Sequence, residues 1–223
     1  MKLKNFLLLF RLKFLRLNFE GSKNFWTQVY ASGGNSGEGS YGELANFKAE
    51  ILNSFVSTHE ISSVMEFGCG DGNQLSLMNY PVYIGLDVAP GAIKRCIEKF
   101  NLDTTKSFLL IEPKYFQPGA SFSADLTLSL DVIFHLSEIE TYETHLRQLF
   151  ASSNKWVIIY GYNSDAFFPE PYSVPRKFTN WIEKNLSEWT LESTVKNRFP
   201  IGSGPEASWS DFYIFRRISD NLI

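Results

Sequence analysis

Cysteine is scarce in this sequence, and neither sign of charge dominates it. Only two cysteines, Cys69 and Cys96, occur among 223 residues, so the sequence supports neither a disulfide framework nor a zinc cluster. Lysine and arginine number 21 against 24 acidic residues, which gives a net charge of −3. That balance excludes the broad positive surface through which proteins hold nucleic-acid phosphates. We therefore expect a reduced, cytoplasmic protein with no nucleic-acid partner.

The N-terminal segment lacks an apolar run that could span a membrane. Its longest run is Phe6–Phe10, whereas a spanning helix needs about 20 residues, and basic residues interrupt the hydrophobic core that a signal peptide needs. Residues 1–19 nevertheless combine basic side chains with two apolar stripes at helical spacing. Two interpretations stay open: a helix packed between its own domain and a second subunit of a homo-oligomer, or a peripheral basic anchor on the inner face of the membrane.

Residues 31–42 contain five glycines, which makes regular structure costly there. Aromatic-rich stretches flank the segment on both sides, which is not typical of a flexible linker, although a linker remains the alternative. We expect a loop that folds over a ligand, with Asn35, Ser36 and Tyr41 as candidate acceptor contacts. Apolar side chains then repeat at helical spacing, which predicts a helix over residues 43–57.

The remainder of the chain alternates between strand and helix patterns. The strand-like segments are residues 62–67, 81–87, 106–111, 125–130 and 156–160, and the helical patterns are residues 73–79, 90–100, 137–150 and 176–186. Repeated strand–helix units predict a parallel sheet covered on both faces. Ser137 and Glu140 have the spacing of a capping box at the start of the third of these helices. Two final alternating segments, residues 189–195 and 209–218, predict an antiparallel pair at one edge.

A glycine turn follows the first predicted strand, with the pattern Glu66-x-Gly68-x-Gly70-x-Gly72. Glycine lets the backbone approach a ligand closely, and the N–H groups that follow provide a polar cradle. The dinucleotide fingerprint would need glycine at position 73, where asparagine stands, and this argues against NAD.

Asp87 stands at the tip of the second predicted strand. A carboxylate there is placed to accept hydrogen bonds from both hydroxyls of a ribose. The alternative is that Asp87 caps the helix that begins near Pro90. Together with the glycine turn, Asp87 predicts a nucleoside site.

These motifs resemble those of the class I S-adenosylmethionine-dependent methyltransferases, over roughly residues 62–160. The glycine turn resembles the family's first motif, which wraps the methionine part of the cofactor, and Asp87 matches its ribose-binding acid. Residues 124–136 resemble the fourth-strand motif, whose end faces the reacting methyl group. The resemblance implies an α/β, Rossmann-like fold with a seven-stranded, mostly parallel sheet, an antiparallel C-terminal hairpin and helices on both faces.

The resemblance also implies a set of residues for S-adenosylmethionine, in which Glu112, after the third strand, is the candidate for the adenine. The full set is Glu66, Gly68, Cys69, Gly70, Gly72, Asp87, Val88, Glu112 and Asp131. The glycine loop is further similar to that of bacterial methyltransferases of surface-polysaccharide biosynthesis.

His135 is the first candidate for a catalytic base, because a neutral imidazole can accept the proton of an alcohol during methyl transfer. Asp131 could orient that histidine, contact the cofactor or hold a metal, although the sequence shows no recognisable metal-ligand spacing. Structural or capping roles are the alternatives for both residues. We interpret His59 and His145 as surface residues and Cys96 as buried.

Acceptor specificity is expected in the segments that cover the strand tips. Aromatic faces with asparagine, serine and arginine between them suit a sugar, and they favour Tyr162 and Arg176 beside the loop residues; Arg198 is a weaker candidate. The alternative for the aromatic side chains is that they pack a small subdomain. The alternative for Arg176 is that it and Lys177 are a solvated pair of charges. We divide the chain into an N-terminal helix (1–22), a cap with the glycine loop (23–60) and a methyltransferase domain (61–218).

The function expected from these features is O-methylation of a sugar or a similar small polar or glycan acceptor. Two alternatives stay open. One is N- or C-methylation of a small metabolite, and the other is a nucleoside-binding module without turnover, docked on a membrane or a partner.

Overall fold

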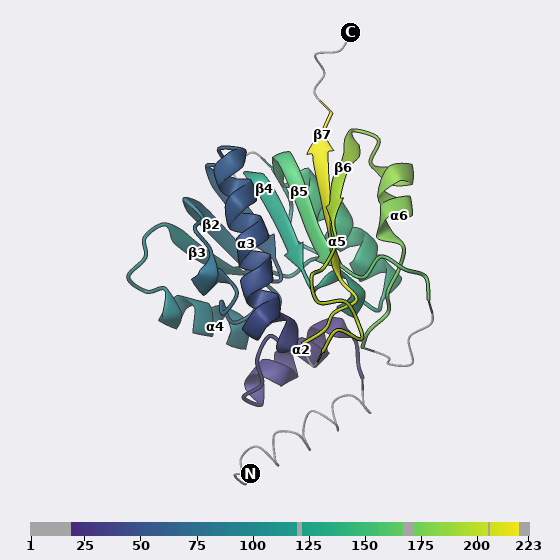
Figure 1. Ribbon diagram of the computed structural model, residues 1–223. Coiled ribbons are helices and arrows are strands. Elements are labelled where there is room, and N and C mark those ends of the chain that lie inside the picture. Colours follow the sequence, from purple (N-terminus) through teal and green to yellow (C-terminus); the bar gives the residue numbers. More distant parts are fainter. Residues whose placement is uncertain (1–18, 120–121, 167–171, 205, 219–223) are drawn as a thin grey trace.

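A seven-stranded sheet forms the centre of the molecule in the computed structural model, with the strand order β3-β2-β1-β4-β5-β7-β6 (Figure 1). The structure describes residues 19–119, 122–166, 172–204 and 206–218. The strands are β1 Ser63–Phe67, β2 Val82–Asp87, β3 Lys106–Leu110, β4 Ala124–Leu130, β5 Ser153–Gly161, β6 Trp189–Val195 and β7 Asp211–Arg217.

The first five strands are parallel, and the last two form an antiparallel pair at one side. β7 pairs antiparallel with both β5 and β6, whereas β1, β2, β3 and β4 pair in parallel with their neighbours, as β4 does with β5. All seven residues of the central strand β4 are buried, as expected for a parallel strand covered on both faces. The predicted sheet and its C-terminal hairpin are confirmed.

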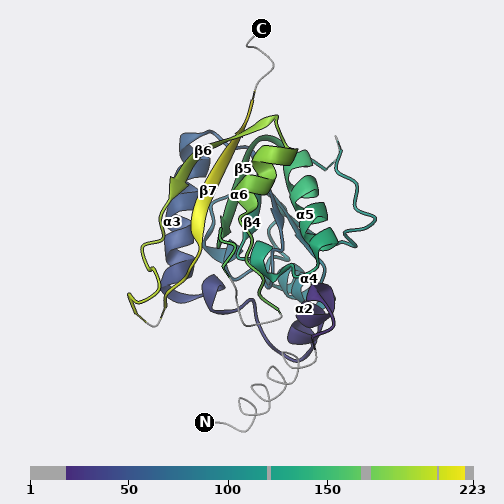
Figure 2. The ribbon, with the colours of Figure 1, turned by 90° about the vertical axis from the view of Figure 1, so that its right-hand side faces the viewer.

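Helices cover both faces of this sheet (Figure 2). The covering helices are α3 Gly42–Thr58, α4 Pro90–Lys99, α5 Ile139–Ala151 and α6 Phe178–Asn185, while α2 Ser22–Ala31 lies beyond the ends of the strands (Figure 1). One apolar core joins α3 and α4 to one face, where Leu52 packs with Leu128 and Ile158. A second core joins α5 and α6 to the other face, where Leu146 packs with Ile159. Ile158 and Ile159 point to opposite faces because side chains alternate along a strand.

Within the segment 23–60, α3 belongs to the same apolar cluster as β4 and β5, whereas Phe25 and Val29 of α2 form a small cluster with Tyr172. The three-part division of the chain stays a prediction. The N-terminal helix expected over residues 1–19 lies outside the described residues, except for Phe19, which packs near Phe25. No helix in the part of the chain that the structure describes has the length and apolar character that a membrane crossing needs.

Two predicted local structures are wrong. Residues 73–79 form only one short 3₁₀ turn, η2 Leu75–Leu77. There the side chain of Ser76 hydrogen-bonds the carbonyl of Asn73 at 2.6 Å, and such local side-chain bonds compete with helix.

The predicted capping box at α5 is also absent. The helix begins at Ile139 without a side-chain cap, and Glu138 instead accepts hydrogen bonds from the backbone N–H and hydroxyl of Ser22. Glu138 thus joins the start of α5 to α2, 116 residues away. The hydroxyl of Ser137, which was expected to cap the helix with Glu140, donates to Glu138 at 3.0 Å.

Candidate functional site

A cavity lies at the carboxyl ends of the parallel strands, which is where ligands bind in open α/β sheets. The ends of β1, β2 and β4 line it. Its empty volume is about 1080 Å³, which includes the open solvent at its mouth. The helices α2, α3 and α5 complete its walls with Trp26, Tyr30, Lys48, His145 and Gln148.

The predicted glycine turn forms one wall of this cavity. Gly68, Gly70 and Gly72 have φ angles of +83°, +60° and +71°, a backbone region that glycine enters at little cost. Gly68 and Gly70 line the cavity together with Cys69, whereas Gly72 does not. A Cβ on Gly72 would meet Phe100 and Cys96, so this glycine allows the turn to pack against the segment that contains α4. Cys96 is buried, as expected.

Asp87 is bound directly to the glycine turn. Its Oδ2 accepts a hydrogen bond from the N–H of Gly70 at 3.0 Å, and its Oδ1 accepts one from the N–H of Ala89 at 2.8 Å. Burial raises the pKa of this carboxyl, while the backbone N–H groups act in the opposite direction. Asp87 therefore serves the start of α4 and also lines the cavity. A carboxylate oxygen can accept more than one hydrogen bond, so both oxygens have capacity for ligand hydroxyls.

Glu66 is a buried acid among the residues that line the cavity. It is 4% exposed and accepts a hydrogen bond from the hydroxyl of Tyr83 at 2.6 Å. Burial raises its pKa from 4.5 to about 7, because a low-polarity surrounding disfavours the charged form. Val88, also expected at the cofactor, lines the cavity.

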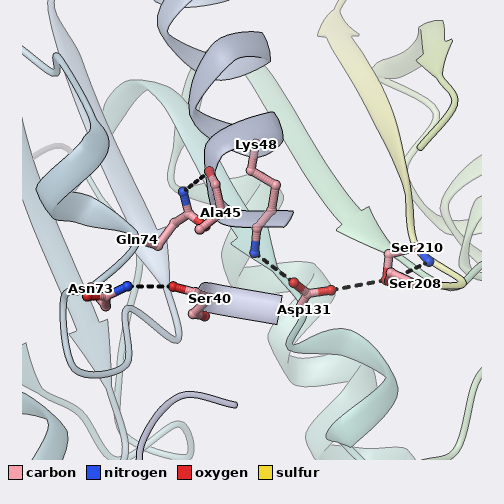
Figure 3. A network of polar contacts seen from close by, with 8 residues as sticks. All are labelled: Ser40, Ala45, Lys48, Asn73, Gln74, Asp131, Ser208 and Ser210. Atoms are coloured by element: carbon pink, nitrogen blue, oxygen red, sulfur yellow. Dashed lines mark hydrogen bonds and ion pairs between the residues drawn. The ribbon is translucent and has the colours of Figure 1, made fainter. Parts of the chain in front are cut away.

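Asp131 takes part in a polar network that the sequence analysis missed (Figure 3). Its Oδ2 forms an ion pair with Nζ of Lys48 at 2.7 Å, and its Oδ1 accepts a hydrogen bond from the hydroxyl of Ser210 at 3.0 Å. Lys48 is fully buried on α3. The sequence could have shown that Lys48 is buried. It lies four residues after Leu44 and four before Leu52, which places it on the apolar stripe of the helix.

His135 lines the cavity, and a backbone carbonyl rather than Asp131 orients its ring. Nδ1 lies 3.0 Å from the carbonyl oxygen of Tyr172, so Nδ1 must donate and Nε2 is left as the acceptor. Of the roles left open for Asp131, orientation of His135 is not the one seen here, since its carboxylate binds Lys48 and Ser210. Burial lowers the pKa of His135 to about 4, which keeps the imidazole neutral at pH 7.

His145 also contributes to the cavity wall, which corrects its interpretation as a surface residue. Its Nε2 lies 2.9 Å from the hydroxyl of Ser129, and burial lowers its pKa to about 4. It was missed because the helical pattern alone did not show which face of α5 meets the sheet. His59, by contrast, is exposed as expected.

The glycine-rich loop is bound to the glycine turn of the cavity. Ser36 and the hydroxyl of Tyr41 both donate to Oδ2 of Asp71, at 3.2 and 2.8 Å, and the N–H of Asp71 donates to the hydroxyl of Ser36 at 2.9 Å. Asn73 reaches the carbonyl oxygen of Ser40 (Figure 3). Of the three loop residues expected at an acceptor, only Ser36 lines the cavity, while Asn35 accepts from Gly37.

The other expected contacts lie away from the cavity wall. Arg176 donates to the backbone carbonyls of Leu136 and Ser137 at 2.7 and 2.6 Å, so its guanidinium holds the chain after β4 instead of forming a solvated pair with Lys177. Tyr162 stacks near Trp209, and Arg198 pairs with Glu50 on the surface.

Glu112 does not line the cavity either. It forms an ion pair with Lys23, whereas its neighbours Ile111 and Pro113 are part of the cavity wall. Within the described ranges, no group of three or more histidine, cysteine, aspartate or glutamate side chains is arranged to hold a metal ion.

The fold has many solved relatives, although neither a family model nor a curated protein sequence matches this chain significantly. N-methyltransferase NodS from Bradyrhizobium japonicum, solved with S-adenosylhomocysteine, has a TM-score of 0.69 at 14% identity over 90% of this chain and 100% of NodS. Magnesium protoporphyrin IX methyltransferase from Synechocystis, solved with S-adenosylmethionine, has a TM-score of 0.62 at 13% identity over 88% of this chain and 97% of its own.

The plantazolicin methyltransferase BpumL, solved with S-adenosylhomocysteine, is a third such structure. It has a TM-score of 0.59 at 14% identity and covers 96% of this chain and 100% of its own. These structural neighbours are methyltransferases that act on different substrates. At such low identity the likeness establishes the methyltransferase fold of this chain, and its activity must be argued from its own residues.

Gly70→Ala should destabilise the protein more than Gly33→Ala. Both glycines have positive φ, but a Cβ on Gly70 would overlap the hydroxyl of Ser36, whereas a Cβ on Gly33 meets nothing within 4 Å. We expect a loss of about 1 kcal/mol for Gly33→Ala from backbone strain, and about 1–3 kcal/mol more for Gly70→Ala from the clash. Urea unfolding measures both values. Equal losses of unfolding free energy in the two variants would contradict close packing of the loop against the turn.

Glu66→Gln should remove a pH-dependent loss of stability. In the folded protein Glu66 keeps its proton up to about pH 7, whereas the unfolded chain releases it near pH 4.5, so the free energy of unfolding falls as the pH rises through this window. Glutamine can still accept the hydrogen bond of Tyr83 and has no proton to release. We expect the variant to gain about 2–3 kcal/mol relative to wild type across the window, measured by urea unfolding. A difference that stays constant with pH contradicts this expectation.

Proposed function

We propose that this protein is an S-adenosylmethionine-dependent O-methyltransferase. The observation that carries the proposal is the hydrogen bond between Asp87 and the N–H of Gly70, at the wall of the cavity. It places an acceptor for ribose hydroxyls beside a turn whose glycines leave the backbone accessible. Asp87 and the turn thus supply the two elements that a nucleoside with an attached chain requires.

The residues of the cavity fit this cofactor in four respects. Asp87 would hold the ribose, while the turn at Gly68 and Gly70 would pass along the chain that bears the sulfur. Ile111 and Pro113 provide apolar surface on the side of β2 and β3, where an adenine ring would pack. The buried Oε1 of Gln74 has no hydrogen-bond partner among the described residues, which leaves an acceptor for a donor on the ligand.

When bound, S-adenosylmethionine supplies an electrophilic methyl group on a sulfonium sulfur. The protein's own contribution is to align an acceptor with that methyl group and to exclude water. Trp26 and Tyr30 of α2 cover the strand ends beside the cavity. His135 is neutral, with Nε2 as its free acceptor position, so we assign it to hold the acceptor hydroxyl and to take its proton as the new bond forms. Asp131 and Lys48 fix the end of β4 next to His135.

A sugar or another small polar molecule is the acceptor class we propose. The polar side chains of Ser22, Ser36, Ser40 and Thr141 line the cavity beside Trp26, and this mixture suits hydroxyl groups on a ring with an apolar face. We further propose that the enzyme is cytoplasmic and acts in surface-polysaccharide biosynthesis, for which the support is the likeness of its glycine loop and the basic side chains of residues 1–19. An N- or C-methyltransferase is the alternative, and N-methylation is the reaction named for NodS.

Asp87→Asn tests the cofactor assignment. Isothermal titration of S-adenosylhomocysteine should show binding to the wild-type protein and about tenfold or more weaker binding to the variant, because a charged acceptor is replaced. The control is Asp103→Asn, which changes an exposed carboxylate that bonds Thr105; its affinity should equal that of the wild type. Absence of binding to the wild-type protein would refute the proposed function.

His135→Asn tests the catalytic assignment, since the asparagine amide can still donate to the carbonyl of Tyr172 but offers no group in the place of Nε2. We expect kcat for sugar acceptors to fall by about 100-fold or more, with the affinity for S-adenosylhomocysteine unchanged. The comparison variant His135→Gln, whose amide reaches the Nε2 position, should lose less. Cofactor binding without methylation of any acceptor would support the non-catalytic module, and mass spectrometry of a product would identify the methylated atom.

A further inference from the structure

Cys69 and Cys96 are the chain's two cysteines, and the fold brings their thiols to the same backbone oxygen. The thiol of Cys96 donates a hydrogen bond to the carbonyl oxygen of Gly70 at 3.2 Å, and Sγ of Cys69 lies 4.0 Å from that oxygen. The two thiols are also hydrogen-bonded to each other, and both are free cysteines. Two thiols in contact need only a small movement to reach the length of an S–S bond, about 2.0 Å.

Glycines make room for both sulfur atoms. A Cβ on Gly72 would lie 3.0 Å from Sγ of Cys96, and a Cβ on Gly85 would lie 2.9 Å from Sγ of Cys69. Cys69 belongs to the glycine turn, whereas Cys96 belongs to α4, so a covalent bond between them would join the turn to that helix. Because little space remains beside either sulfur, formation of the bond requires the backbone of the turn to move.

The two thiols differ in how a small molecule can reach them. Cys69 lines the cavity, whereas Cys96 is fully buried, so an oxidant that enters the cavity meets Cys69 first. The hydrogen bond with Cys96 and burial raise the pKa of the Cys69 thiol. Little thiolate therefore forms near pH 7, and the pair stays reduced until an oxidant is present.

We propose that Cys69 and Cys96 form a redox modification site, in which hydrogen peroxide joins them in a reversible disulfide. The sulfur of Cys69 attacks one peroxide oxygen and breaks the O–O bond, which gives a sulfenic acid and water. The sulfur of Cys96 then attacks the sulfur of the sulfenic acid, and the S–S bond forms as the hydroxyl group leaves as a second water. In total the two thiols lose two hydrogens and two electrons, and the peroxide is reduced to water.

The disulfide is expected to weaken ligand binding at the neighbouring nucleoside site. It consumes the S–H donor of the Gly70 carbonyl, and it moves the turn whose N–H at Gly70 binds Asp87. A ligand that holds the turn in its reduced geometry opposes the disulfide by the same factor, because the two effects are reciprocal. This effect on the ligand rests on the proposed function, whereas formation of the disulfide does not.

Diamide tests the site in the wild-type protein, since this azo compound takes up both hydrogens as a hydrazine and adds no oxygen to a single thiol. After treatment of the folded protein, we expect both thiols to be lost and a peptide that contains Cys69 to be linked to one that contains Cys96 within one chain. Isothermal titration should show about tenfold or more weaker binding of S-adenosylhomocysteine, with recovery after dithiothreitol. Saturation with S-adenosylhomocysteine during the treatment should slow the loss of thiols.

Cys96→Ser is the matched control, because its hydroxyl can still donate to the carbonyl of Gly70 but cannot form a disulfide. Its affinity for S-adenosylhomocysteine should stay within about twofold of that of the wild type, both before and after diamide. The wild-type experiment does not depend on whether this variant folds.

Two results would overturn the inference. In one, the thiols of the folded protein persist, or link only different chains, under conditions in which diamide oxidises the protein in urea. In the other, the cross-linked protein binds S-adenosylhomocysteine as tightly as the reduced protein does. Absence of binding by the reduced wild-type protein would instead refute the proposed function, and the thiol counts would still decide whether the disulfide forms.

Discussion

The hydrogen bond between the carboxylate of Asp87 and the N–H of Gly70 determines how the rest of the site is arranged. It joins the end of β2 to the turn after β1, and the same carboxylate reaches the first turn of the following helix through Ala89. The turn can come this close only because its glycines adopt positive φ angles. Without this carboxylate, the turn and the start of α4 would each lose a hydrogen bond that positions them. The loop that contacts the turn would then be held less firmly.

Around this contact the cavity is built from segments that are far apart in the chain. α2 and the glycine-rich loop provide a cover, the strand ends provide the base, and α3 contributes a buried cation where the apolar stripe would call for a hydrophobic residue. Burying a lysine is expensive unless a negative group compensates for it. Asp131 is that group, and Ser210 stabilises the pair from the C-terminal hairpin.

The sequence was sufficient to predict the sheet, its hairpin and the glycine turn with Asp87, because each depends on local patterns whose period or spacing is read directly. It was not sufficient where a tertiary contact replaces a local one. Glu138 binds Ser22 of α2 at the start of α5, where Ser137 and Glu140 were expected to form a capping box, and His145 lines the cavity although it was expected on the surface. Lys48 was missed for the same reason, since only packing shows that its charge meets Asp131. Whether Asp131 orients His135 depends on the directions of the two side chains, and the spacing of residues in the sequence does not show these directions.

The bond from Ser210 to Asp131 has a consequence for how the protein is made. The two residues are 79 positions apart, so a ribosome has already synthesised all five parallel strands before it reaches the serine. The strands that carry Asp87 and the glycine turn are therefore complete while the lysine–aspartate pair still lacks its third member. The polar cluster at the far end of the cavity is completed only when the last hairpin has docked.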